Sequence, residues 1–458
     1  MDNVTHSLAG LLLAATAVEV RARRRSGGAD DRSFAPLAAV TGIAGANLPD
    51  IDVVWSAALQ GAGVYDGLLS LLHHRGYTHT LLAAVVCIPM LWLAALWFRR
   101  RQLRDTITSD ARRACDRHTL LALSIVAVLS HLSLDFTNDY GVHPFSPFVD
   151  RWAYGDSVFI IEPWLWVAAV PMLLRTVVRR GWRWALGGVL GLGVTLCWVV
   201  PLVSLAAAAV VTIGAVVMLL LAHATPVHRA PMTGIVVWVV VTGLSASGTY
   251  LVRQSVRTQS VRTQAVRTQA VRTQAVAAAG RAKQHAPAVD DFRLLDVMTS
   301  PSPATPLCSR VITVEATREE YRLTTAWGSA VPWLVSATWC SRAVKTDTTR
   351  GARMLPMQRA SRVDTPALEW QWTWGAPRAA LIRLAAENCR VSTWLRFVRA
   401  PFWVPAPGDS VRVGDLRYDR DRASVAAFTF SARREPCPRA APPWTRPRAD
   451  LLSADWAD

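Results

Sequence analysis

Charged residues are scarce in this chain, and lysine is almost absent. Only 18% of its 458 residues are Asp, Glu, Lys or Arg, whereas soluble domains usually carry about 25%. This deficit argues against an ordinary cytosolic enzyme, and a hydrophobic content of 52% excludes disorder over most of the chain. Lys283 and Lys345 are the two lysines. A preference for arginine over lysine throughout the chain reflects the base composition of the genome rather than a binding site for an anionic partner.

Cysteine is also sparse. The seven cysteines show no CxxC spacing and are too few for a disulfide scaffold. Four of them fall in the last third of the chain: Cys308, Cys340, Cys389 and Cys437. We expect one or two disulfides among these four in an oxidising compartment, and the alternative is four unpaired buried thiols.

What the chain does contain is a large excess of positive charge, a net +17, which by itself is typical of nucleic-acid binders. Its distribution points elsewhere, because the apolar half, residues 1–251, carries a net +4 and residues 252–458 carry +13. We therefore predict no nucleic-acid partner. An anionic membrane or envelope surface is the expected neighbour of the basic half.

Apolar runs recur along the first half of the chain, and six of eight reach the roughly 17–25 residues that a membrane-spanning helix needs. The first run is marginal and the second is short enough for a re-entrant segment. The runs cover residues 4–20, 35–48, 77–98, 119–137, 158–174, 184–200, 202–222 and 233–251. The fold class predicted is an α-helical multi-pass membrane domain of six to eight spans, followed by a mainly β extracytoplasmic domain.

Arginine predicts the orientation of these spans in the membrane. The alternating loops 21–34, 99–118, 175–183 and 223–232 together carry 17 arginines, whereas loops 47–76 and 138–157 carry only Arg75 and Arg151. The positive-inside rule assigns the arginine-rich loops to the cytoplasm. The amino terminus and residues 252–458 are then expected outside.

Histidine and aspartate collect at the predicted outer ends of the apolar runs, in four clusters. Such residues are costly in a bilayer and tend to be functional there. The clusters are His6; Asp50 and Asp52; His73, His74 and His79; and His131, Asp135 and Asp139. Each cluster alone also fits a helix cap, a solvated loop or a hydrogen-bonded pair, but their convergence on one side favours a metal site.

The ligand types and spacing favour a divalent metal. His131 and Asp135 are four residues apart and share one helix face, which Asp139 would continue if the helix ran so far. Imidazole and carboxylate suit zinc or manganese. The candidate ligands His6, Asp50, His73, His74, His79, His131 and Asp135 exceed the four that one tetrahedral zinc takes, so the set allows two ions.

The ordered set of motifs resembles the bacterial membrane-bound metal-dependent hydrolases, whose prototype is described as LexA-regulated. The resemblance covers about residues 1–175. It is carried by His6, by Pro49-Asp50-Ile51-Asp52, by His74-Arg75-Gly76-Tyr77-Thr78-His79 and by His131-Leu132-Ser133-Leu134-Asp135. It implies a helical membrane domain and metal-dependent hydrolysis, and leaves open whether His73 or His74 is a ligand.

The hypothesis for the chemistry is water activated by metal, with Asp52 or Asp139 as proton acceptor. Arg75 is either a phosphate-binding group or a membrane-surface anchor. A site at the outer face favours membrane lipids as neighbours and a lipid, lipid-linked or envelope molecule as the substrate. The bond expected to be cleaved is a phosphoester. The alternatives are a metal or ion transporter that uses the same cluster, and a non-catalytic envelope assembly protein.

The chain divides into a membrane core (1–175), further transmembrane helices (176–251), a linker (252–306), a mainly β domain (307–446) and a tail (447–458). The linker contains a fourfold repeat of Val-Arg-Thr-Gln-Ser/Ala over residues 256–275. We interpret it as a helical or flexible linker made by tandem expansion, and the alternative is a basic stalk that touches anionic headgroups. In the β domain, alternation predicts that Trp370, Trp372 and Trp374 share one strand face, either a buried sheet face or a carbohydrate platform.

Overall fold

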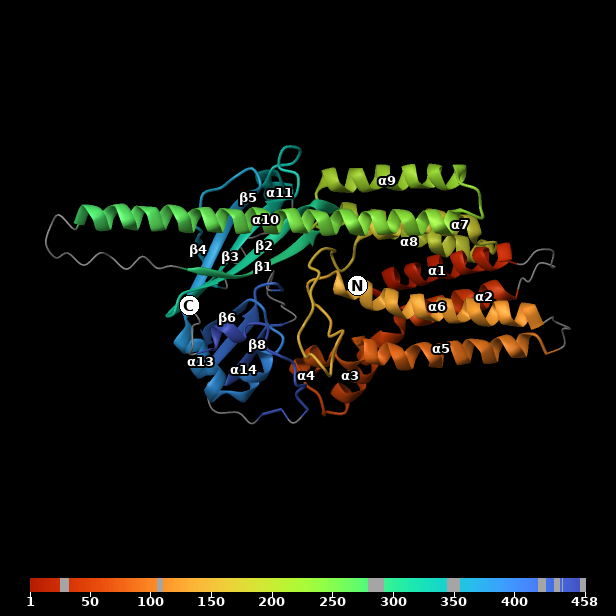
Figure 1. The fold of residues 1–458 in the computed structure, drawn as a ribbon, viewed down its shortest axis with the longest axis horizontal. Helices are drawn as coiled ribbons and strands as arrows, with labels where there is room; N and C mark the ends of the chain where they lie inside the picture. Colours follow the sequence, from red (N-terminus) through yellow and green to blue (C-terminus); the bar gives the residue numbers. More distant parts are fainter. Residues whose placement is uncertain are drawn as a thin grey trace.

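A computed structural model describes residues 1–24, 33–104, 110–278, 292–343, 355–418, 426–431, 437, 438 and 440–453. It consists of a bundle of long helices and, at one end of that bundle, a domain of two antiparallel sheets (Figure 1). The predicted fold class is therefore confirmed.

The bundle contains seven helical segments, among the described residues, that are long and apolar enough to cross a membrane. They are α1 (Asn3–Arg24), α2 (Phe34–Asn47) together with α3 (Ile51–Gly61), α5 (Leu81–Gln102), α6 (Asp110–Phe136), α8 (Arg180–Val199), α9 (Leu205–Ala224) and the first part of α10 (Ala230–Ala278). Shorter elements are η1 (Leu48–Asp50), α4 (Gly67–His73), η2 (Tyr77–His79) and α7 (Pro163–Thr176).

Two of the expected apolar runs form different elements from those predicted. The short second run continues through η1 into α3, so that residues 34–61 together reach spanning length. The fifth run, 158–174, forms only the 14-residue α7, which is shorter than a candidate span. Ten residues of α7 are buried, because it packs inside the bundle against α1, α8, α9 and α10 rather than facing lipid.

Close backbone contact fixes the pairing of α1 with α2. A Cβ atom placed on Gly10 would lie 2.3 Å from the carbonyl oxygen of Gly42, and one on Gly42 would lie equally close to the carbonyl of Gly10. Small residues permit this approach between membrane helices. The pairing brings the start of α1, which carries His6, beside the end of α2, which η1 and Asp50 follow.

The described residues of all four arginine-rich connections lie at the end of the bundle that is remote from the β domain (Figure 1). Two of the arginines there are buried rather than exposed: Arg21 of α1 and Arg99 of α5 bind the two carboxylate oxygens of Asp116 in α6, at 2.6 and 2.7 Å. Both guanidinium groups also lie over the ring of Phe34. These arginines therefore join helices as well as marking one end of the bundle.

The larger sheet has the strand order β1-β2-β3-β5-β4 and the smaller one β6-β7-β8. The strands are β1 (Arg293–Ser302), β2 (Thr305–Ala316), β3 (Glu320–Ser329), β4 (Gln358–Arg359), β5 (Leu368–Pro377), β6 (Pro401–Ala406), β7 (Ser410–Asp415) and β8 (Phe428–Ser431). The helices α11 (Ala337–Ala343), α13 (Arg378–Glu387) and α14 (Cys389–Trp394) and the 3-10 turn η3 (Ala449–Leu451) accompany them. Two disulfides, Cys308–Cys340 and Cys389–Cys437, join the four cysteines of this domain.

The three tryptophans of β5 do not share one face, contrary to the prediction. Ala326 pairs with Trp370 and Leu323 with Trp374, with a register shift between them. The extra residue on β5 reverses the alternation of side chains. Trp370 is consequently buried against α10 and Trp374 in the core on the other side of the sheet.

The first part of the predicted linker is helical and packs on the larger sheet as an extension of the last span. Helix α10 continues unbroken to Ala278, and Val252 and Val256 are fully buried against the larger sheet. Trp370 Nε1 donates a hydrogen bond to Gln259 Oε1 at 3.1 Å. The sheet also begins at Arg293, inside the predicted linker. The side chains of residues 263–278 lie outside the description.

The β domain and the bundle share a core. Leu68 and Leu72 of α4 pack in one cluster with residues of the β domain such as Trp394. The tip of the β1–β2 hairpin enters the bundle, where the carbonyl of Ala304 accepts a hydrogen bond from Trp164 Nε1 at 3.1 Å. The β domain is therefore docked on the end of the bundle that carries the His/Asp clusters.

Candidate metal centre

Three elements bring four residues of the His/Asp clusters together at this end of the bundle. Asp50 ends η1, His79 ends η2, and His131 and Asp135 lie one turn apart near the end of α6. Pro49 in the first turn of η1 fits the fixed backbone angle of proline, and the turn places Asp50 directly after α2. His79, His131 and Asp135 are fully buried, and Asp50 is 9% exposed.

Four ligand atoms, one from each residue, lie at nearly equal separations. His79 Nε2 is 3.0 Å from His131 Nε2, 3.1 Å from Asp135 Oδ2 and 3.4 Å from Asp50 Oδ1. His131 Nε2 is 3.3 Å from Asp135 Oδ2 and 3.5 Å from Asp50 Oδ1. Around a tetrahedral zinc with ligand distances of about 2.0–2.1 Å, ligand atoms lie about 3.3–3.4 Å apart. The five separations between these atoms given above are close to that spacing, and all four atoms lie within 4.8 Å of one another.

The hydrogen bonds on the outer side of each histidine determine which ring nitrogen carries the proton. His131 Nδ1 lies 2.7 Å from the carbonyl oxygen of Ala46, so it must be the protonated nitrogen. His79 Nδ1 lies 3.0 Å from Thr78 Oγ1, which donates in turn to Asp52 Oδ2 at 3.2 Å. Both Nε2 atoms are then left with free lone pairs, the arrangement that supports metal-bound histidines.

The four converging atoms are consequently all electron-pair donors. In the neutral tautomers that these hydrogen bonds favour, two imidazole nitrogens and two carboxylate oxygens face one another. Among the described residues, Asp135 Oδ2 is buried and has no hydrogen-bond partner. A buried group of this kind is costly unless a cation neutralises it, so the residues fit a divalent metal ion.

The other carboxylate oxygen of Asp135 is held by positive or protonated groups. Arg75 Nη2 lies 3.0 Å and His6 Nε2 lies 3.2 Å from Asp135 Oδ1, and the α-amino group of Met1 also contacts this atom. The ring of His6 stacks on that of His131, with centroids 3.9 Å apart. His6 is thus brought to the site, beside a ligand residue rather than within the group of four.

A second group of potential ligands adjoins the first and shares Asp50 with it. It consists of Asp50, Asp52 and His74. His74 Nδ1 lies 3.4 Å from Asp52 Oδ1, and the His74 side chain is 29% exposed, in contrast to the buried group of four. This group is therefore the solvent-facing edge of the site, and it contains His74 rather than His73.

Arg75 is buried and bound through its backbone N–H and both terminal nitrogens, although its Nε has no hydrogen-bond partner among the described residues. Its backbone has a φ of 57°, a left-handed conformation that few non-glycine residues adopt, and its N–H donates to Asp52 Oδ2 at 2.7 Å. Its guanidinium binds Asp135 and, at 2.8 Å, Asn138 Oδ1. Only 2% of the residue is exposed. Arg75 therefore orients ligand residues, and neither the phosphate-binding nor the surface-anchor interpretation matches this position.

Two predicted site residues lie apart from both groups. His73 stacks on Tyr65, and its Nε2 lies 2.8 Å from the carbonyl oxygen of Ala440. Asp139 falls beyond α6, which ends at Phe136, so it does not continue the helix face of His131. The Asp139 carbonyl accepts a hydrogen bond from Arg417 Nη1 at 2.6 Å, and this residue faces the β domain.

Asn138 and His143 are outside the candidate residues predicted from the sequence, although both contact Arg75. Asn138 is a polar neighbour of the Asp135 motif, a weak signal that was present in the sequence. His143 lies between Trp152 and Trp444, with ring centroids 3.8 and 3.9 Å away. Burial lowers the pKa of His143 to about 3. No sequence spacing links it to Trp444, which comes from the other end of the chain.

Comparison with known proteins gives one family match. The family described as YdjM inner membrane protein matches residues 1–211, from the start of the chain into α9. The β domain lies beyond this match. Together with the seven candidate spans, the match supports a multi-pass inner-membrane protein. No curated protein and no solved structure matches the chain.

Proposed function

We propose that this protein is a membrane-bound metal-dependent hydrolase that acts on a lipid, lipid-linked or envelope substrate, with a phosphoester as the bond cleaved. The single observation that carries the proposal is the convergence of four electron-pair donors, largely buried and all within 4.8 Å of one another. Asp50, His79, His131 and Asp135 would hold the ion, zinc or manganese by their chemistry. A divalent cation supplies Lewis acidity and lowers the pKa of water.

The chain's own groups suit proton transfer at the edge of this centre. Asp52 Oδ1 lies 3.4 Å from His74 Nδ1 and holds that side of the ring. The ring is partly exposed, so its Nε2 atom is free to take a proton from water. Arg75 neutralises Asp135 from the side remote from the four atoms. In this proposal His74 is the proton acceptor and Asp52 is a positioning residue.

The surroundings of the site favour an amphiphilic substrate. Helix α3 follows Asp50 directly and buries only Asp52 and Ser56. Val53, Val54 and Trp55 are 50%, 70% and 65% exposed. A lipid or lipid-linked molecule could place its polar group at His74 while its chain lies along this apolar face.

The location of the site is proposed to be extracytoplasmic. The centre lies at the end of the bundle opposite the arginine-rich connections (Figure 1), which the positive-inside rule assigns to the cytoplasm. The two disulfides of the docked β domain favour the same orientation, since disulfides persist in oxidising compartments.

Metal analysis of the purified full chain tests the centre itself. We expect about one equivalent of zinc or manganese in the wild type, held by the group of four, and loss of metal in His79→Ala and Asp135→Ala. His73→Ala is the matched control, because that histidine lies outside both groups. Full metal content in the two ligand variants would contradict the proposal.

Activity on a panel of phospholipids and polyprenyl phosphoesters tests the reaction. The expected result is hydrolysis that stops on chelation and returns when zinc or manganese is added back. Phosphoester hydrolysis that persists in the chelated protein, or in His79→Ala, would rule out the proposed chemistry. Retention of metal with no turnover of any substrate in the panel would argue for the transporter instead.

A further inference from the structure

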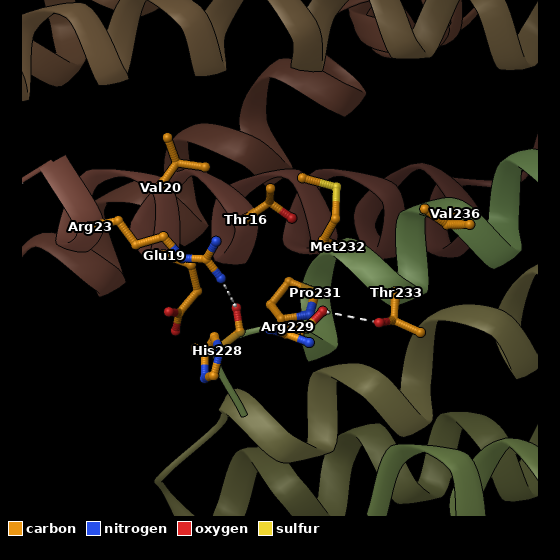
Figure 2. Close-up of a pocket in the computed structure, with 10 residues that line it drawn as sticks. All are labelled: Thr16, Glu19, Val20, Arg23, His228, Arg229, Pro231, Met232, Thr233 and Val236. Atoms are coloured by element: carbon orange, nitrogen blue, oxygen red, sulfur yellow. Dashed lines mark hydrogen bonds between the residues drawn. The ribbon is translucent and has the colours of Figure 1, made fainter. Parts of the chain in front are cut away.

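A cavity of about 360 Å³ lies at the opposite end of the bundle from the metal centre. Figure 2 shows the side chains that line it, which come from the last turns of α1 and from the start of α10 with the residues before it. They are Thr16, Glu19, Val20, Arg23, His228, Arg229, Pro231, Met232, Thr233 and Val236. None of them belongs to the site described above.

The lining changes from charged to apolar along the direction of the spans. Arg23 and Arg229 lie at the ends of their helices, whereas Thr16 and Val236 lie two turns further in. Seven residues of helix separate Thr16 from Arg23, a rise of about 10 Å. The cavity therefore extends from the level of the lipid headgroups into the hydrocarbon core, which is about 30 Å thick.

Its polar groups suit a phosphate with a neighbouring hydrogen-bond donor. Two guanidinium groups, Arg23 and Arg229, present donors that match phosphate oxygens. Arg23 Nη2 also donates to the carbonyl of His228 at 3.3 Å, which ties α1 to the segment before α10. The carboxylate of Glu19 offers an acceptor for a hydroxyl or ammonium group on the same molecule.

Two further features point to an amphiphilic ligand. Among the described residues, Thr16 Oγ1 is a buried lining atom with no hydrogen-bond partner, although a helical threonine commonly bonds the carbonyl four residues back. Val20, Met232 and Val236 are 40%, 48% and 54% exposed, so the deeper wall is open to the acyl chains of the bilayer.

We propose that this cavity binds one glycerophospholipid from the leaflet at the arginine-rich end, with its phosphate between Arg23 and Arg229, its headgroup donor on Glu19 and an acyl chain along Val20 and Val236. Basic pockets between spans are known sites for anionic lipid headgroups. The same phosphate chemistry occurs in free anions, but these would have no use for the apolar wall.

Native mass spectrometry of the full chain in detergent tests the proposal with three probes. These are dioctanoyl phosphatidylglycerol, dioctanoylglycerol without the phosphate and glycerol phosphate without the chains. We expect one tightly bound phosphatidylglycerol per chain and binding of the other two that is weaker by about tenfold or more, because each lacks one half of the contacts. Equal binding of glycerol phosphate would identify a soluble-anion site and overturn the lipid assignment.

A charge-matched pair of variants locates the site. Arg23→Gln/Arg229→Gln is expected to lower phosphatidylglycerol affinity by about tenfold or more. The control Arg24→Gln/Arg183→Gln removes the same charge at the same end from exposed arginines that do not line the cavity. Unchanged metal content shows that both variants are folded. An equal loss of lipid in the two pairs would show non-specific attraction and refute the proposed site.

Discussion

Nε2 of His79 and Nε2 of His131 lie 3.0 Å apart, although 52 residues separate the two histidines in the chain. Each ring uses its other nitrogen for a hydrogen bond to a polar partner, Thr78 or the carbonyl of Ala46. Two unprotonated nitrogens at this distance repel each other unless a shared cation lies between them and the nearby carboxylates.

Asp52→Asn is expected to weaken metal binding without abolishing it. The substitution keeps the size of the side chain but removes the charge that supports His79 through Thr78. Outer partners of metal-bound histidines typically contribute about 10–100-fold in affinity. Competition with a chelator of known affinity measures the change. Asp139→Asn is the matched control, and an equal effect in both variants would contradict the positioning role of Asp52.

Asp116→Ala is expected to destabilise the bundle at the end remote from the metal centre. Arg21 and Arg99 would lose their common partner and remain as buried charges, and removal of one member of a buried ion pair typically costs about 3–5 kcal/mol. Thermal denaturation in detergent should show a lower midpoint. Asp110→Ala, at the exposed start of α6, should leave the midpoint almost unchanged. A similar drop in that variant would contradict the stabilising role of the Arg21–Asp116–Arg99 ion pairs.

Thiol labelling should distinguish the two classes of cysteine. Cys87, Cys115 and Cys197 are unpaired in the described part of the chain, while the other four form two disulfides. Alkylation of the denatured, unreduced protein should therefore add three groups, and alkylation after reduction should add seven. Addition of seven groups without reduction would argue against both disulfides and against the proposed orientation.

Glu162 should make the stability of the protein depend on pH. Its carboxylate caps α7 and accepts hydrogen bonds from the backbone N–H groups of Trp164 and Ala304, at 3.3 and 3.2 Å. Complete burial raises the pKa of Glu162 from its usual 4.5 to about 8. The folded state therefore holds the proton more tightly than the unfolded state does.

The sign of the effect follows from that difference. The contribution of Glu162 to stability is fully present below about pH 4.5 and is lost as the pH rises to about 8. Glu162→Gln keeps a neutral group and should remove this part of the pH dependence. Denaturation midpoints of both proteins across this range provide the measurement, and parallel curves would contradict the raised pKa.

Much of the site could be predicted from local sequence. The i,i+4 spacing of His131 and Asp135 places them on one face of α6, and the ends of apolar runs place Asp50 and His79 at the same membrane level. The choice between His73 and His74 could not be made this way. It depends on the end of α4 at His73 and on the turn that follows, which carries His74 towards Asp52 and His73 towards the β domain.

The residues around the centre depended more strongly on the tertiary fold. Arg75 was read as facing an anion or the membrane surface, but its left-handed backbone turns it inward to Asp135 and Asn138. Asp139 lies past the last turn of α6, so helical spacing no longer applies to it. On β5, one extra residue moved Trp370 and Trp374 to opposite faces, because the alternation of a strand has a period of two.

By itself, the sequence determined that this chain is a helical membrane protein with a β domain, and that its histidines and aspartates gather at one end of the spans. Hydrophobic length and the cost of burying charge act locally, so they can be read from composition and spacing. Only the tertiary structure decided which four atoms meet, that α10 packs on the sheet through Val252 and Val256, and that the β domain is docked over the centre. Those contacts join residues hundreds of positions apart, and packing and hydrogen-bond partners select them rather than any local pattern.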